Sequence, residues 1–281
     1  MSDLVITSPA NPRLRDVLAL RRRRIRDERA LSLVEGREEL TLALDAGARP
    51  QALYWCPELW GPQDHTDVID RVRGTGGQCV RVSRAAFEKI AYRQGPDGFL
   101  AVLPAASRPL ADLDPYGVHH RLQPRDTDTA TGPLVLLCQG VEKPGNLGAM
   151  LRTADAAGVA AVIAADPVTD WGNPNLVRAS KGTVYSVPVA ADTGPACLDW
   201  LSAHAIPIVA LTPGGDADYA DVDYTGPVAL AVGAEKTGLT DLVLAAAAHR
   251  VVIPMAGRAD SLNVATSAAV VLYEAVRQRR R

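Results

Sequence analysis

The pattern of apolar positions divides the chain into two parts, and both parts predict α/β structure. In the first part, short apolar runs alternate with stretches of helical period. The predicted helices are Pro12–Arg24, Gly36–Ala46, Thr66–Arg73 and Arg84–Ala91, and the predicted strands are Ala52–Cys56, Cys79–Val82 and Phe99–Leu103. Asn11 followed by Pro12 is a helix-start signal. This part is predicted to be a small α/β domain.

The second part has apolar runs that are continuous rather than alternating. Such runs are typical of parallel strands that are covered on both faces. They are Leu134–Cys138, Val159–Ala165, Val184–Val189, Ile206–Leu211, Val228–Val232 and Val251–Ile253. Helical stretches at Ala149–Ala157, Ala196–Ala203 and Leu242–Ala247 lie between them. The pattern predicts a mostly parallel sheet with helices on both sides.

A segment rich in proline and aspartate, with no hydrophobic period, separates the two parts. We therefore predict a first domain at residues 1–107, a linker at 108–129 and a second domain at 130–281. The linker contains His119 and His120 side by side. No further ligand follows at metal-binding spacing, so we interpret the pair as part of a solvated loop rather than a zinc site.

The composition narrows the class of protein. The chain has 281 residues, of which 47% are apolar, enough to bury sizeable cores. It has no run of about 18 apolar residues and no apolar N-terminal core, so we expect a soluble cytoplasmic protein. Its four cysteines are far apart, and each lies in or beside an apolar run. We expect reduced core residues rather than a disulfide framework or a metal site at Cys56, Cys79, Cys138 and Cys197.

The net charge of −2 conceals a basic stretch near the N-terminus. Residues 11–30 hold eight arginines against three acidic residues. One interpretation is a solvated helix face in an arginine-rich chain, and the other is a surface that contacts phosphates, which the planar guanidinium suits. On the second interpretation the candidate RNA-binding residues are Arg13, Arg15, Arg21, Arg22, Arg23 and Arg24.

Glycines and small polar residues follow several of the predicted parallel strands, where ligands bind in open α/β sheets. "TPGG" follows Leu211, "GAEKTGL" follows Val232 and "PMAGRADSLN" follows Ile253. "GAEKTG" lacks the Gly-x-Gly-x-x-Gly spacing, and the chain has no phosphate-binding Gly-x-x-x-x-Gly-Lys-Ser/Thr motif. An NAD enzyme and a P-loop ATPase are therefore disfavoured.

Three blocks in the second part resemble the three motifs of the SpoU/TrmH RNA 2′-O-ribose methyltransferases, in the same order. They are "NLGAMLRTADAAG" (146–158), "AVGAEKTGL" (231–239) and "IPMAGRADSLNVATSAAVVLYE" (253–274). Residues 178–189 resemble the segment between the first two motifs, and residues 11–48 resemble a substrate-binding domain of the family. The resemblance implies a deep trefoil knot in the C-terminal domain, which binds S-adenosyl-L-methionine, and a homodimer formed through that domain.

The resemblance also implies a set of functional residues. The catalytic positions are Asn146, Arg152, Glu235, Ser261 and Asn263, and the cofactor-binding positions are Leu211, Thr212, Gly233, Ile253, Met255 and Leu262. Methyl transfer from a sulfonium to a ribose hydroxyl needs alignment and removal of the hydroxyl proton, and no metal. Arg152 is the family's proposed proton acceptor, although a guanidinium more naturally holds a phosphate or stabilises an oxyanion.

Each catalytic candidate also has a purely structural interpretation. Asn146 and Ser261 are possible helix caps, Arg152 a solvated helical residue, and Glu235 with Lys236 a turn ion pair. Two departures from the family pattern, Glu142–Lys143 and Lys181, add cations beside the presumed RNA path. These departures leave the choice of RNA open.

The leading functional hypothesis is methylation of a ribose 2′-hydroxyl in structured RNA. The additional N-terminal domain favours 23S ribosomal RNA over transfer RNA by analogy with the family. The arginine- and alanine-rich composition resembles that of a high-GC bacterium, in which some family members protect the ribosome against the host's own antibiotic. The alternatives are a non-catalytic ribosome-assembly factor that binds RNA, and a small-molecule α/β enzyme that uses another cofactor.

Overall fold

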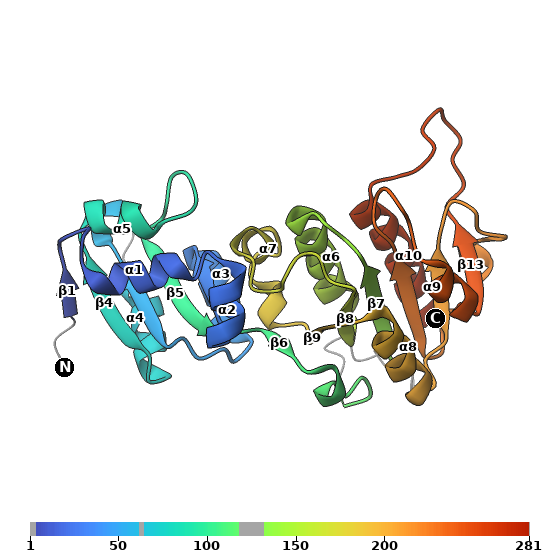
Figure 1. The fold of residues 1–281 in the computed structure, drawn as a ribbon, viewed down its shortest axis with the longest axis horizontal. Coiled ribbons are helices and arrows are strands. Elements are labelled where there is room, and N and C mark those ends of the chain that lie inside the picture. The colour runs from blue at the N-terminus through green and yellow to red at the C-terminus, as the bar shows by residue number, and fades with distance from the viewer. Residues whose placement is uncertain (1–3, 62–64, 118–131, 281) are drawn as a thin grey trace. The chain divides into compact units, whose positions relative to one another are not determined.

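The computed structural model describes residues 4–61, 65–117 and 132–280 and contains two sheets, each at the centre of its own unit (Figure 1). The first unit is formed by Met1–Ala106 together with Asp170–Ser186, and the second by Ser107–Thr169 with Val187–Arg281. The sequence analysis assigned residues 170–186 to the second domain, whereas here they pack into the first unit. His119 and His120 lie outside the described residues.

The first unit has a five-stranded mixed sheet of order β1-β4-β3-β5-β2. β1, β4 and β3 are parallel, and β5 and β2 run antiparallel to their neighbours. The strands are β1 Leu4–Ile6, β2 Leu31–Glu35, β3 Ala52–Trp55, β4 Gln78–Val82 and β5 Phe99–Pro104. The helices are α1 Pro12–Ala19, α2 Arg23–Arg29, α3 Arg37–Asp45, α4 Thr66–Gly74, α5 Arg84–Ile90 and, from the inserted segment, α7 Pro174–Ala179. The predicted small α/β domain is therefore confirmed.

The helix predicted at Pro12–Arg24 is in fact two helices. Its start is confirmed, because Asn11 Oδ1 accepts the Arg13 amide at 3.0 Å and Pro12 occupies the first turn. The chain leaves helical geometry at Arg22, which is extended, and α2 begins at Arg23. The buried guanidinium of Arg26 satisfies two carbonyls of this break, those of Leu20 at 3.0 Å and Arg21 at 2.8 Å. The break thus depends on a tertiary contact that helical periodicity does not report.

Arg26 also anchors the inserted segment. Its Nε and Nη2 donate to the two carboxylate oxygens of Asp170 at 3.0 and 2.6 Å, and only 4% and 13% of the two side chains are exposed. Further along the segment, Lys181 pairs with Glu38 at 3.1 Å. Gly182 has φ of +84°, and a Cβ there would lie 2.5 Å from the Glu39 carbonyl oxygen. The cation that Lys181 adds is therefore already paired with an acidic residue of α3.

The second unit has an eight-stranded sheet of order β11-β13-β10-β12-β7-β8-β9-β6. All of its strand pairs are parallel. The strands are β6 Ser107–Arg108, β7 Leu134–Gln139, β8 Ala161–Ala165, β9 Val189–Asp192, β10 Ile208–Leu211, β11 Ala217–Asp218, β12 Val228–Val232 and β13 His249–Val252. The helices are α6 Pro144–Ala157, α8 Gly194–Ala203, α9 Asp241–Ala246 and α10 Val264–Arg279. This confirms the predicted parallel sheet.

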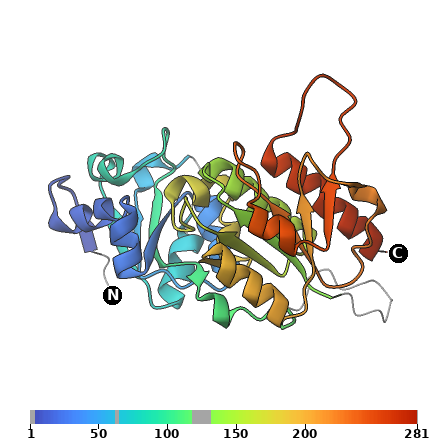
Figure 2. The same ribbon diagram turned by 45° about the vertical axis from the view of Figure 1, so that its right-hand side comes forward.

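Helices cover both faces of this sheet (Figure 2). α8 and α9 pack together over a core that includes Cys197, Trp200 and Val243, while α6 and α10 pack against each other. Arg279 near the end of α10 donates to the carbonyls of Gly132 at 2.7 Å and Gly226 at 2.6 Å. The last helix is thereby tied to the segments that precede β7 and β12. This packing of α10 against α6 is consistent with the expected knot.

One strand prediction in the second part was wrong. Residues 184–189 do not form a strand, because Thr183–Tyr185 is a turn of 3-10 helix and β9 begins only at Val189. Local hydroxyl bonds stabilise the turn: Ser180 Oγ donates to the Val177 carbonyl at 2.9 Å and Thr183 Oγ1 to the Ser180 carbonyl at 2.7 Å. Apolar content alone does not reveal such bonds.

The cysteine prediction is confirmed. Cys56, Cys79, Cys138 and Cys197 are all buried and free. Burial raises the pKa of the Cys197 thiol to about 12, so it behaves as a small apolar side chain. No helix among the described residues is both long enough and apolar enough to cross a membrane.

We predict that Arg26→Ala lowers the free energy of unfolding by about 3 kcal/mol, because it leaves the Asp170 carboxylate and two carbonyls without their buried donor. Arg24→Ala is the matched control. Arg24 is 79% exposed and pairs with Glu28 at 3.4 Å, so its loss should change stability by less than about 0.5 kcal/mol. Urea unfolding of both variants checks this, and equal effects would contradict a structural role for Arg26.

Candidate active site

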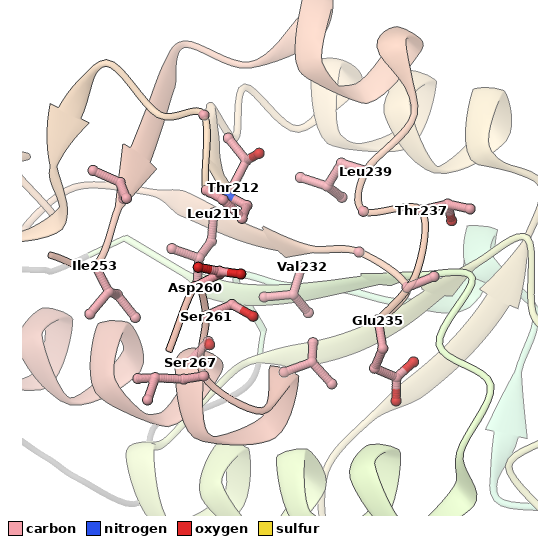
Figure 3. Close-up of a pocket in the computed structure, with 18 of the residues that line it drawn as sticks. Leu211, Thr212, Val232, Glu235, Thr237, Leu239, Ile253, Asp260, Ser261 and Ser267 are labelled. Carbon is pink, nitrogen blue, oxygen red and sulfur yellow. The ribbon is translucent and has the colours of Figure 1, made fainter. Parts of the chain in front are cut away.

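A pocket opens at the carboxyl edge of the sheet in the second unit. It is a pocket of about 1010 Å³ formed by the loops that follow β10, β12 and β13 (Figure 3). Leu211, Val232, Leu239 and Ile253 supply apolar walls. Its position agrees with the strand-end loops in which the sequence predicted a ligand site.

The loop after β12 folds back on itself because glycines permit it. A Cβ at Gly233 would lie 2.2 Å from the backbone carbon of Gly238, so no other residue fits this approach. Gly238 has φ of +68°, and its amide donates to the Ala234 carbonyl at 2.9 Å. The closed loop carries Glu235 and Thr237 at its tip, where Figure 3 shows both side chains. The backbone of the second motif is therefore fixed before any ligand binds.

A chain of hydrogen bonds joins the three motifs. Asn263 is the N-cap of α10, and its Oδ1 accepts the Ala265 amide at 2.9 Å. Its Nδ2 therefore faces outward and donates to Asn146 Oδ1 at 3.2 Å. Asn146 in turn donates through Nδ2 to Glu235 Oε1. The helix cap fixes the direction of every donor in the chain, and segments 117 and 89 residues apart meet at Asn146.

The cofactor residues expected from the resemblance all line this pocket: Leu211, Thr212, Gly233, Ile253, Met255 and Leu262. Glu235, Ser261 and Asn263 also line it, and Asn146 contacts it through the hydrogen bonds described above. Arg152 is on α6 but outside the pocket lining. It is exposed and makes no hydrogen bond or ion pair with any described residue. The structure thus brings four of the five catalytic candidates together and leaves the fifth free.

Three of the four alternative structural interpretations fail, whereas Arg152 is an exposed helical residue as its alternative interpretation holds. Lys143, not Asn146, is the N-cap residue of α6, and Asn263, not Ser261, is the N-cap of α10. Within the described residues, Glu235 bonds to Asn146 and forms no ion pair with Lys236. Neither polar side chain proposed as a cap is thus explained by helix termination.

The pocket lining includes acidic residues that the sequence analysis did not single out. Asp241 and Asp260 line the pocket together with Glu235. Both residues lie in or directly after the strand-end loops, and this position could have predicted them from the sequence. A ligand with a cationic group would find a counterion here.

The residues present fit S-adenosyl-L-methionine. The volume suits a nucleoside-sized ligand, the apolar side chains suit a purine ring, and the carboxylates suit an ammonium group. Among the described residues, no group of three or more His, Cys, Asp and Glu side chains is arranged to hold a metal ion.

The predicted RNA-binding arginines of the first unit differ in their contacts. Arg13 donates to Gln78 at 3.1 Å, and Arg21 donates to the Ala91 carbonyl at 2.6 Å. Arg23 and Arg24 pair with acidic residues one helical turn away at 3.4 Å. Arg15 and Arg22 are exposed, and no described residue bonds to either guanidinium. Contact with a phosphate therefore competes with an existing bond at four of the six positions.

Comparison with known proteins identifies relatives of both units. Residues 133–273 match the SpoU rRNA Methylase family, and residues 11–101 match the MRM3-like substrate binding domain. The 23S rRNA (guanosine(2553)-2′-O)-methyltransferase RlmP of Bacillus subtilis (strain 168) is 29% identical over 95% of this chain and 97% of its own length.

Solved structures resemble the whole chain. The AdoMet-bound rRNA methyltransferase from Sinorhizobium meliloti has a TM-score of 0.84 and 31% identity, and the match covers 97% of each chain. The SpoU methyltransferase AviRb from Streptomyces viridochromogenes, in complex with AdoMet, has a TM-score of 0.80 and 28% identity over 96% of this chain and 99% of that one. Both have been solved with the same methyl donor.

We predict that Asn146→Ala lowers the rate of methyl transfer by at least about 100-fold, because Glu235 and Asn263 lose the side chain that holds them together. Affinity for S-adenosyl-L-methionine should change little, since Asn146 is outside the pocket lining. Thr153→Ala on the same helix is the control and should retain activity, because its hydroxyl bonds only to the Ala149 carbonyl. Calorimetric titration and single-turnover kinetics separate the two effects. A loss of donor affinity as large as the loss of rate would reassign Asn146 to donor binding.

Proposed function

We propose a target, an assembly and residue roles for this chain, which belongs to the SpoU rRNA methylase family. The protein is an S-adenosyl-L-methionine-dependent RNA ribose 2′-O-methyltransferase. The observation that carries the residue roles is the hydrogen-bond chain through Asn146, which brings all three motifs to one pocket. The proposed target is 23S ribosomal RNA.

The proposed mechanism follows from what the side chains can do. Bound S-adenosyl-L-methionine supplies an electrophilic methyl group. The glycine-closed loop and the apolar walls hold the donor pocket in shape, and Asn146 fixes Glu235 and Asn263 beside it. Ser261 and Asn263 face the ribose. These residues align the hydroxyl oxygen for attack.

Arg152 completes the proposed site. Its guanidinium is free among the described residues and stays protonated at neutral pH, so it is poorly suited to act as a base. We assign it to the phosphate beside the target ribose and to the hydroxyl oxygen, where it stabilises negative charge as the hydroxyl proton passes to solvent water and the methyl group moves from sulfur to oxygen. A free cation is what such a role requires, because a paired guanidinium would have to break its bond first.

The choice of ribosomal RNA is supported by both units. The RlmP relative aligns along nearly its whole length, and its name specifies 23S rRNA. The first unit matches a substrate-binding domain, which a small target would not need. The proposed place of action is the cytoplasm, where ribosomal RNA is available.

We further propose that the protein is a homodimer through its second unit. Tyr273 on α10 is 49% exposed, and Leu262 and Met255, which line the pocket, are 38% and 36% exposed. A second copy of the chain would cover such apolar side chains. The oligomeric state in solution tests this.

The central experiment is methylation of ribosomal RNA from a strain that lacks the gene. With purified enzyme and labelled donor, we expect 2′-O-methylation at one position of 23S rRNA, unaffected by chelator and abolished by Arg152→Ala. Transfer RNA alone as the substrate would refute the ribosomal target. Donor and RNA binding without any transfer would indicate an assembly factor. A lowered tolerance of a ribosome-targeting antibiotic in the deletion strain would assign the methylation a protective role.

The salt dependence of RNA binding tests the arginine patch. Arg15→Gln and Arg22→Gln should each reduce the log–log slope of affinity against salt by roughly 0.7 to 0.9, because their guanidinium groups are free to bind phosphates. Arg24→Gln is the matched control within the patch, and it should change the slope less because Glu28 already neutralises it in part. The methylated position should not move, since phosphates carry no base identity. Unchanged slopes in both free-arginine variants would show that the patch is a solvated face.

A further inference from the structure

A row of four residues crosses the first sheet at the carboxyl ends of its parallel strands. Val5 is paired with Arg81, Arg81 with Trp55, and Trp55 with Phe99. Residues directly opposite each other on neighbouring strands project from the same face of a sheet. Two aromatic rings, a guanidinium and an aliphatic side chain therefore lie next to one another.

The aromatic rings continue into a stack. The Trp60 ring is parallel to the Phe99 ring, at an angle of 1° and a centroid distance of 5.3 Å. Trp55 stacks on Trp60 at 5.5 Å and 24°. The Arg81 guanidinium carbon lies 5.7 Å from the centre of the Trp55 ring. The order Phe99, Trp60, Trp55, Arg81 is a continuous series of planar groups.

Burial falls from one end of this series to the other. Phe99 is fully buried, Trp60 and Trp55 are half-buried, and Arg81 is exposed. Val5, beside Arg81, has 58% of its surface exposed. The Arg81 side chain makes no hydrogen bond or ion pair with any described residue, and its guanidinium contacts the Trp55 ring. The open end of the stack thus has an unneutralised cation over an aromatic ring.

The two indoles of the stack keep N–H groups without a partner in the described part of the chain. The indole N–H groups of Trp55 and Trp60 are buried and have no acceptor among the described residues. A buried donor without a partner is unfavourable, and phenylalanine would avoid it. The backbone also makes room for Trp60, since a Cβ at Gly98 would lie 3.1 Å from its ring and 2.4 Å from the Cys56 carbonyl oxygen.

We propose that an unpaired nucleobase of the RNA substrate stacks on the surface formed by Trp55 and Arg81, next to Val5. The RNA identity rests on the proposed function, and the geometry defines the subsite. Aromatic and guanidinium planes are the surfaces on which proteins stack unpaired bases, and a free arginine beside them attracts the adjacent phosphate. Every base has a flat face, so the subsite tolerates any of the four.

The test compares two probes on the full-length protein: a short single-stranded RNA and inorganic polyphosphate, which has the charge but no bases. Trp55→Ala should weaken RNA binding by about tenfold and leave polyphosphate binding unchanged. Trp55→Phe should retain most RNA affinity, since a ring remains. Arg81→Gln should weaken binding of both probes and reduce the salt slope. Fluorescence anisotropy measures the affinities.

The matched control is Tyr116→Ala, which removes an aromatic side chain that is 55% exposed and bonds only to the His204 carbonyl of the second unit. It should bind both probes as the wild type does. Thermal unfolding of every variant excludes misfolding, and Trp55→Phe keeps the test valid if Trp55→Ala unfolds.

Three outcomes overturn the proposal. Trp55→Ala could bind single-stranded RNA with wild-type affinity, or lose affinity for RNA and polyphosphate equally. It could also bind naked RNA normally and lose affinity only for intact ribosomal particles, which would assign the surface to a protein. Failure of the proposed function is recognised separately, because a wild-type enzyme that does not methylate ribosomal RNA would still show whether Trp55 stacks on bases.

Discussion

The hydrogen bonds that Asn146 makes to Glu235 and Asn263 hold together side chains from all three motifs of the second unit. The three residues come from segments far apart in sequence, and the parallel sheet brings those segments to one edge without fixing their side chains. The cap of α10 supplies the missing constraint. Because Asn263 Oδ1 is held by the Ala265 amide, its Nδ2 has only one direction in which to donate, and Asn146 and Glu235 follow. The Ala265 backbone amide thus fixes the orientation of the Asn263 side chain, and through it those of Asn146 and Glu235.

Much of this arrangement could be predicted from sequence. Continuous apolar runs marked β7, β10, β12 and β13, and the glycines after three of them marked the ligand edge, because these signals are local and strong. The motif resemblance then placed every cofactor candidate on the pocket wall. The sequence could not predict which hydrogen bonds the side chains of the motifs form. Asn146 and Ser261 are residue types that often cap helices. Neither caps a helix here, because the N-cap residues of α6 and α10 are Lys143 and Asn263.

Two other differences from the sequence-based predictions share a cause. The break after Leu20 and the packing of residues 170–186 with the first unit both depend on Arg26, which is buried with Asp170. In the sequence Arg26 is one of eight arginines in a basic stretch, and charge counting treats all eight alike. The structure separates them into a buried anchor, paired residues and two free cations. Only burial and the identity of the partner distinguish a structural arginine from one available to a phosphate, and both arise from tertiary structure.

These distinctions bear on how the enzyme selects one ribose. Phosphate contacts by free arginines report the path of the RNA backbone and carry no base identity. Stacking on an aromatic surface such as Trp55 reports that a base is unpaired, again with little preference among bases. Neither contact of the first unit therefore distinguishes nucleotides by base identity. On the proposed function, selection falls to geometry: a ribose reacts when a folded RNA bound by the first unit presents its 2′-hydroxyl beside Asn263 and Glu235. A target defined by shape in this way needs a large folded RNA, which is why a substrate-binding unit accompanies a catalytic pocket that is complete within the second unit.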